Sequence, residues 1–299
     1  RLLYIEKEKT ATINIRDFYL RRMLRIYPVY YIVFIVGLLF YHVLLPLVGI
    51  KYDIEYSLGE AIFYCVGFLP NVLKAKYEVG AILFILWSIG IEEQFYLFIA
   101  PVVKFVKLKA IPLLLSMFTV VYMLLYFSPI FEGFSKYQFL YFYFSLGGFI
   151  SILAYQGKLS FLTFKNKYAR LLLYFCFILT FLIAFPKGFF NSYGHGAFAL
   201  LTSLTILNLS EEDTFIVENR FINYLGKISY GLYMYHIIVI YVVLFGFLKI
   251  KNFIQLDSTS LIVFINVITF IASILVSHIS YVLIEKQVLA LKKKIRHTR

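Results

Sequence analysis

The chain has 299 residues, of which 62% are hydrophobic, 20% aromatic and only 15% charged. Its mean hydropathy is +0.83, and it holds too few polar residues to cover a soluble core of this size. This excludes a soluble globular protein and predicts an integral membrane protein. The two cysteines, Cys65 and Cys176, lie in apolar runs, so a disulfide framework and a cysteine-based metal site are excluded as well.

Long apolar segments recur along the whole chain. A membrane-crossing helix needs about 20 mostly apolar residues, and in lipid its backbone hydrogen bonds must be satisfied internally. We therefore expect an all-α, polytopic transmembrane bundle of about eight spans, forming a single membrane domain over residues 1–299. Residues 59–73 are apolar but too short to cross, which predicts a re-entrant or surface-lying segment. The predicted spans are residues 26–45, 83–103, 110–128, 137–155, 171–186, 193–209, 228–248 and 260–284.

The net charge of +13 is distributed as an orientation signal rather than as a nucleic-acid-binding surface. Five of the segments between or beyond the spans carry 22 of the 29 Lys and Arg residues, and the loops on the other side carry 7. The positive-inside rule then places both termini in the cytoplasm. The two basic ends are a segment at residues 1–25 and a tail at residues 286–299.

Arginines gather where the first span begins, in the stretch RDFYLRRMLRIYPVYY. On a helix Arg21 and Arg25 share a face, and Arg22 lies about 100° around from Arg21. Guanidinium groups bind phosphate oxygens in a bidentate manner, so the cluster suits a cytoplasmic cofactor that bears a nucleotide. The same residues also fit an ordinary positive-inside anchor, and both interpretations stay open.

Two adjacent carboxylates, Glu92 and Glu93, interrupt the apolar stretch LFILWSIGIEEQFYLFIAPVV. A charged side chain in the middle of a membrane costs about 2.5–3.5 kcal/mol on insertion scales, and less near an interface. An interfacial position would explain Glu93 alone. Ser88, Glu92 and Tyr96 fall four residues apart on one helical face. Together with Trp87, this face predicts the lining of a polar cavity.

A second polar face occurs in the stretch ISYGLYMYHIIVIY of the seventh predicted span. Ser229, Tyr233 and His236 follow one another at i, i+4 and i+7. A lone histidine in an apolar helix is usually a packing residue, but the alignment with a serine and a tyrosine favours a cavity-lining role. Glu285, near the end of the last span, is expected to pair with Lys286.

Four stretches, FYLRRMLRIYPVYY, LWSIGIEEQFYLF, SYGLYMYH and SYVLIEKQVL, follow one another as in the acyltransferase family 3 membrane proteins. The chain resembles that family over essentially its whole length. The pattern WSxxxEEQFY is the most specific, and the arginine-rich stretch is next. The members are O-acyltransferases of the bacterial inner membrane that modify polysaccharides and other exported molecules. The resemblance therefore implies a multi-pass protein of that membrane.

The resemblance also implies a reaction: transfer of an acyl group, most often acetyl, from cytoplasmic acyl-CoA to a hydroxyl of a cell-surface or exported saccharide. The expected partners are acyl-CoA, a saccharide or lipid-linked glycan acceptor and membrane lipids. Acyl-CoA acts as a co-substrate, with no bound cofactor and no metal. The implied roles are CoA-phosphate binding for Arg21, Arg22 and Arg25, support of catalysis for Glu92, Glu93, Ser88 and His236, and cavity lining for Trp87, Tyr96, Ser229 and Tyr233.

One departure concerns the histidine thought to be catalytic in the family. It lies in the first of two spans that usually precede the equivalent of the stretch RLLYIEKEKTATINIRDFYLRR, and no numbered position here matches it. We expect two further spans upstream of residue 1, and the alternative is an inactive, truncated relative. A transporter or flippase for a lipid-linked saccharide is the other open interpretation, because intramembrane ionisable residues also serve transport.

Overall fold

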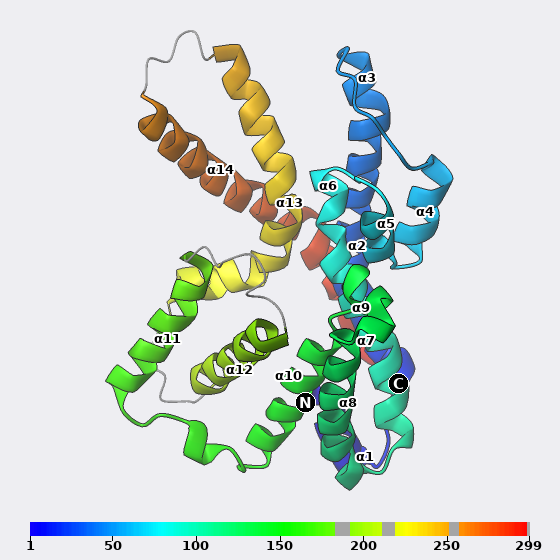
Figure 1. The fold of residues 1–299 in the computed structure, drawn as a ribbon, viewed down its shortest axis with the longest axis vertical. Coiled ribbons are helices and arrows are strands. Elements are labelled where there is room, and N and C mark those ends of the chain that lie inside the picture. Colours follow the sequence, from blue (N-terminus) through cyan, green and yellow to red (C-terminus); the bar gives the residue numbers. More distant parts are fainter. Residues whose placement is uncertain (183–191, 211–218, 251–256, 298–299) are drawn as a thin grey trace. The chain divides into compact units, whose positions relative to one another are not determined.

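A computed structural model describes residues 1–182, 192–210, 219–250 and 257–297 of the protein. Within these ranges the regular elements are all helical (Figure 1), which confirms the predicted all-α class. The chain divides into two compact units. Unit 1 comprises Arg1–Ile15 and Ile91–Val217, and unit 2 comprises Arg16–Gly90 and Glu218–Arg299.

Unit 1 is built mainly from helices of moderate length. Thr119 and Ser145 share a buried hydrogen bond of 2.8 Å where α8 and α10 pack along each other. Lys7 of α1 attaches the N-terminal helix to the end of α7, because its Nζ donates to three backbone carbonyls there. The helices of this unit are α1 (Leu2–Thr10), the larger part of α7 (Leu86–Phe105), α8 (Ile111–Tyr126), α9 (Glu132–Lys136), α10 (Tyr141–Tyr155), α11 (Lys167–Leu182) and α12 (Ser192–Leu209).

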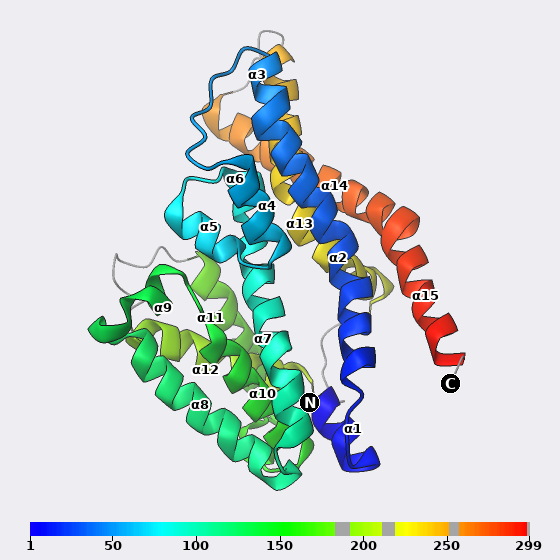
Figure 2. The same cartoon turned by 90° about the vertical axis from the view of Figure 1, so that its right-hand side faces the viewer.

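Unit 2 contains the longest helices of the chain. Its α2 continues through a π-helical turn into α3, while α13 and α14 pack against each other. Figure 2 shows the short helices α4, α5 and α6 beside α2. The helices of this unit are α2 (Ile15–Leu39), α3 (Leu45–Leu47), α4 (Leu58–Val66), α5 (Pro70–Lys76), α6 (Ala81–Phe84), the first turn of α7, α13 (Arg220–Ile250), α14 (Ser258–Ser280) and α15 (Lys286–His297).

The apolar segments predicted as spans are mainly helical where the structure describes them, but they differ in length. Predicted span 171–186 is described as far as residue 182, and 193–209 corresponds to a shorter apolar helix, Gly194–Leu209. A further apolar pair, Pro129–Lys136 and Tyr141–Tyr155, is bent by 83° and would count as a sixth span. Five helices of the described residues are long and apolar enough to cross a membrane: Ile15–Leu47, Ala81–Phe105, Leu108–Tyr126, Arg220–Lys249 and Thr259–Leu291.

The segment at residues 59–73, predicted not to cross, forms the two short helices α4 and α5. Ser57 and Glu60 cap the start of α4 reciprocally, each side chain accepting a hydrogen bond from the backbone N–H of the other. The Tyr30 hydroxyl of α2 donates to the Cys65 carbonyl at 2.9 Å and so ties α4 to the long helix. Neither short helix is long enough to cross a membrane.

Close packing at Gly80, just before α6, gives a test of this arrangement. Gly80 has φ +75°, and a Cβ there would overlap the Tyr41 ring. Gly80→Ala is expected to destabilise the protein by about 1–3 kcal/mol, because it combines backbone strain with an overlap. Gly49→Ala is the matched control, since Gly49 has φ +76° with no atom within 4 Å. Thermal unfolding in detergent, followed by circular dichroism, should show the larger loss for Gly80→Ala, and equal losses would contradict the close contact with Tyr41.

Candidate functional site

Two of the polar residues singled out in separate spans meet in unit 2. The Tyr233 hydroxyl of α13 lies 2.5 Å from the Ser88 hydroxyl of α7 and 3.1 Å from the Ile85 carbonyl between α6 and α7. A carbonyl only accepts, so the three atoms are satisfied when Ser88 donates to Tyr233 and Tyr233 donates to Ile85. The contact joins residues 145 positions apart in the sequence.

A cavity of about 600 Å³ opens beside this contact, and we name it the Trp87 pocket. Its walls come from the loop before α4, from α5 and the loop that follows it, from α6, from the start of α7 and from α13, all within unit 2. Large aromatic surfaces with a few convergent polar groups are typical of small-molecule sites. The polar and aromatic members of its lining include Tyr52, Lys74, Tyr77, Glu78, Phe84, Trp87, Tyr233 and His236.

His236 is held in this pocket by its own helix. Its Nδ1 lies 2.5 Å from the Tyr233 carbonyl, which can only accept, so Nδ1 donates the hydrogen bond. In the neutral imidazole Nε2 is then the unprotonated nitrogen and can accept a proton or a hydrogen bond. The arrangement makes His236 an acceptor for a hydroxyl group placed in the Trp87 pocket.

Lys74 is one of several pocket residues that the sequence did not single out. Its Nζ lies 4.0 Å from the centroid of the Trp87 ring and 4.3 Å from that of Phe84, within the range of cation–π attraction. Partial burial lowers the pKa of Lys74 to about 8. In the sequence it is one loop lysine among several, and only the packing of α5 against α7 reveals its surroundings.

Tyr77 and Glu60 form a short hydrogen bond beside the pocket. The Tyr77 hydroxyl donates to Glu60 Oε1 at 2.6 Å. This bond, together with the two hydrogen bonds from Ser57, lowers the pKa of the Glu60 carboxyl to about 2, and the same Tyr77–Glu60 bond raises the pKa of Tyr77. The bond holds the Tyr77 ring, which lines the pocket, against α4.

The acidic pair lies farther along α7. The Tyr96 hydroxyl donates to Glu92 one turn back, as expected for residues on one helical face, and the Glu93 side chain is buried. Neither glutamate belongs to the lining of the Trp87 pocket. Ser229, expected to line a cavity with Tyr233, is exposed and donates to the Gly226 carbonyl of its own helix at 3.0 Å.

The arginine cluster lies on α2, as expected. Arg21 and Arg22 are partly buried and Arg25 is exposed, with the Arg22 guanidinium 5.7 Å from the Phe18 ring. The positive charge of Arg25 interacts electrostatically with the carboxylate of the buried Glu285. From the sequence, Lys286 was the expected partner of Glu285. The cluster therefore contains three cations and lies near one carboxylate, that of Glu285, which comes from the C-terminal part of the same unit.

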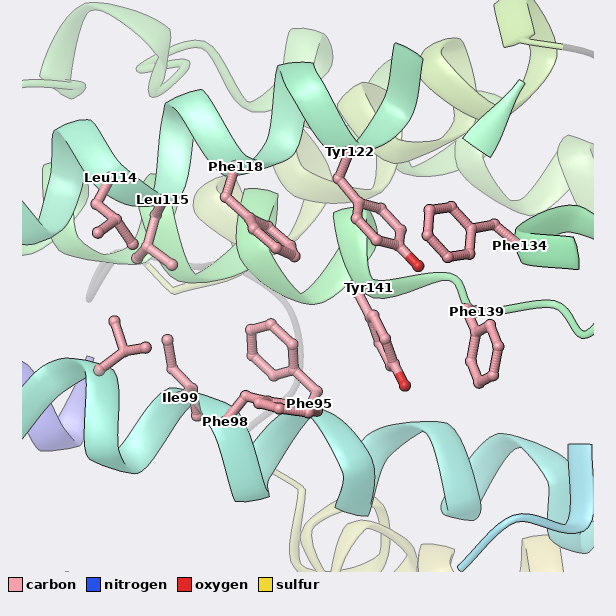
Figure 3. A pocket seen from close by; sticks show the side chains of 11 residues that line it. Phe95, Phe98, Ile99, Leu114, Leu115, Phe118, Tyr122, Phe134, Phe139 and Tyr141 are labelled. Atoms are coloured by element: carbon pink, nitrogen blue, oxygen red, sulfur yellow. The ribbon is translucent and has the colours of Figure 1, made fainter. Parts of the chain in front are cut away.

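A second cavity, of about 460 Å³, lies in unit 1 and is lined by apolar and aromatic side chains (Figure 3). Among the lining side chains, Tyr122 and Tyr141 carry hydroxyl groups, and Tyr141 donates to Gln94 at 2.5 Å. These walls offer no acid or base for acyl transfer, and they suit hydrocarbon instead. In the described ranges no three His, Cys, Asp or Glu residues are grouped to hold a metal ion.

The long apolar helices and the polar pocket define a multi-pass helical membrane protein. Residues 2–278 match the family model of the acyltransferase domain of acyltransferase family 3. The chain belongs to that family, so the resemblance is confirmed and the protein is a membrane acyltransferase in general terms. Searches of curated proteins and of solved structures return no match.

Proposed function

We propose that the protein transfers an acyl group, in the simplest case acetyl, from cytoplasmic acyl-CoA to a hydroxyl of a cell-surface or exported saccharide at the bacterial inner membrane. The Trp87 pocket carries this proposal, because Trp87, Tyr233 and His236 line it from two helices and Ser88 contacts Tyr233 beside it. O-acylation of a glycan needs hydrogen-bonding groups that orient a hydroxyl beside a thioester. The pocket supplies such groups next to aromatic surface.

In the reaction the acceptor oxygen attacks the thioester carbonyl carbon, a C–O bond forms, and the C–S bond breaks. The hydroxyl proton leaves to a base, and the CoA thiolate is the leaving group. We assign His236 Nε2 as the atom that accepts a hydrogen bond from the acceptor hydroxyl. The Ser88–Tyr233 pair holds the wall against which that hydroxyl is placed. Glu92, in contact with Tyr96, and Glu93 have supporting roles on the same helix.

The donor is expected at the arginine cluster. Arg21, Arg22 and Arg25 on α2 present guanidinium groups that suit the phosphates of CoA. The Glu285 carboxylate lies within electrostatic range of Arg25. In this scheme the CoA phosphates bind on the cytoplasmic side, and the pantetheine arm carries the thioester into the bundle, where it meets the acceptor hydroxyl.

Binding of acetyl-CoA to the purified protein in detergent tests the proposal. Arg22→Ala/Arg25→Ala is expected to weaken binding at least about tenfold, because two charge-assisted contacts to phosphate are lost. Lys107→Ala/Lys109→Ala is the matched control, since it removes the same charge from exposed positions. S-acetylpantetheine, which lacks the nucleotide phosphates, should bind weakly and be insensitive to the arginine change. Wild-type protein that does not bind acetyl-CoA, or binds both ligands alike, would contradict a CoA enzyme and favour a lipid-linked saccharide transporter.

A further inference from the structure

The Trp87 pocket contains the Lys74 ammonium group, to which the proposed acyl transfer assigns no role. Lys74 lies near the end of α5, with its ammonium over the rings of Trp87 and Phe84. The neighbouring Lys76, on the same helix, interacts instead with Tyr64, to whose hydroxyl it donates at 2.6 Å. Only the first of these two lysines lines the pocket.

An ammonium group loses hydration when it lies among aromatic rings, and this loss costs free energy. Partial burial lowers the pKa of Lys74 to about 8, so the side chain remains mostly charged at pH 7. A neutral sugar gains little from a charge at this cost, whereas a carboxylate or phosphate gains a charge-assisted hydrogen bond. The position of Lys74 therefore favours an anionic ligand.

On the basis of the proposed function, we propose that the Trp87 pocket binds a saccharide acceptor that bears an anionic group, and that Lys74 binds this carboxylate or phosphate. The pocket also contains the Glu78 carboxylate and the His236 imidazole. These acceptors suit the hydroxyl groups of the same sugar, while the anion lies at the lysine. Aromatic rings between them offer apolar surface to the sugar ring.

The chain has one tryptophan, so Trp87 reports on this pocket alone. Its ring lies under the Lys74 ammonium, 4.0 Å away. An anion that attracts the ammonium changes the electrostatic field at the indole and hence its emission. Intrinsic fluorescence of the purified protein in a non-ionic, tryptophan-free detergent is thus a direct binding signal.

Two matched pairs of probes distinguish the source of the anion. Tetragalacturonate is compared with neutral cellotetraose, and glucose 6-phosphate with glucose. Anionic members should change Trp87 emission saturably at pH 7, and Lys74→Gln should weaken their binding about tenfold or more. Lys76→Gln removes the same charge two residues along α5 and outside the pocket lining. It should leave binding within about twofold of wild type. A response to the sugar carboxylate only, or to the phosphate only, identifies the source.

The dependence on pH supplies a second readout. Because the pKa of Lys74 is about 8, its charge is present below pH 8 and is lost as the pH rises from 7 to 9. Binding of the anionic probes should weaken over that window in wild type and should not do so in Lys74→Gln. The other ionisable groups facing Lys74 in the pocket are Tyr52, Tyr77, Glu78, Tyr233 and His236, and the variant retains all of them.

Three outcomes overturn the proposal. Equal binding of the anionic and neutral members would be consistent with a saccharide acceptor site but would contradict its preference for an anionic acceptor. Unchanged binding in Lys74→Gln would assign the anion to another residue. No binding of any probe, by emission and by equilibrium dialysis, would refute the pocket as a saccharide site. Acetyl-CoA binding is measured separately, so failure of the donor site and failure of the acceptor class are distinguishable.

Discussion

Replacement of Lys7 by methionine is expected to give one of the largest losses of stability in the chain. The Lys7 Nζ donates to the carbonyls of Val103, Lys104 and Val106, at 2.7, 2.8 and 2.6 Å. The last carbonyls of a helix have no partner within the helix, and a cation there also meets the negative end of the helix dipole. One buried ammonium group thus satisfies three acceptors at the end of α7.

Methionine keeps most of the length and packing of lysine but can donate no hydrogen bond. Leaving those carbonyls unsatisfied should cost about 3 kcal/mol or more, which corresponds to a fall in the apparent Tm of roughly 6 °C or more. Thermal unfolding in detergent measures this fall. Hydrogen exchange should also accelerate in α1, because Lys7 attaches that helix to α7.

The control is Lys9→Met on the same helix. Lys9 is exposed, so its replacement should change the apparent Tm by less than about 1 °C. Equal small effects of the two substitutions, with unchanged exchange in α1, would show that the three hydrogen bonds do not hold α1 in place. Lys7 was expected from the sequence only as one of several basic residues of a cytoplasmic segment.

The helical class could be predicted from the sequence because the membrane imposes it. Long apolar runs in lipid have to satisfy their own hydrogen bonds, so the segments at residues 83–103 and 228–248 are helical in the structure. Bends were not predictable in the same way. The 83° bend between Pro129–Lys136 and Tyr141–Tyr155 lies at the start of predicted span 137–155, and hydropathy does not encode helix direction.

Part of the candidate site also followed from helical periodicity. The Ser88 face of one span and the Tyr233–His236 face of another were each expected to line a cavity; Tyr233 and His236 line the Trp87 pocket, and Ser88 contacts Tyr233 beside it. Periodicity gives the face of a helix but not its neighbour. Lys74 was therefore out of reach, because its role depends on where a short helix between spans packs.

Substitution of His236 is expected to have the largest effect on activity, within the proposed function. His236→Asn retains a donor near the Nδ1 position for the Tyr233 carbonyl but removes the group at Nε2. Incorporation of labelled acetyl from acetyl-CoA into membrane glycan should fall about 100-fold, the scale typical for a group that assists proton movement. The KM for acetyl-CoA should stay unchanged, because the donor phosphates are assigned to the arginines.

His236→Gln distinguishes hydrogen bonding from simple packing. Glutamine carries an amide oxygen to about the distance of Nε2, so it should recover part of the rate if Nε2 accepts a hydrogen bond from the acceptor hydroxyl. A histidine that only fills space would respond to both substitutions through stability, with a lower apparent Tm and no separation of kcat from KM. An unchanged rate in His236→Asn would remove this residue from the mechanism and leave Tyr233, held by its contact with Ser88, as the hydroxyl group in the pocket wall.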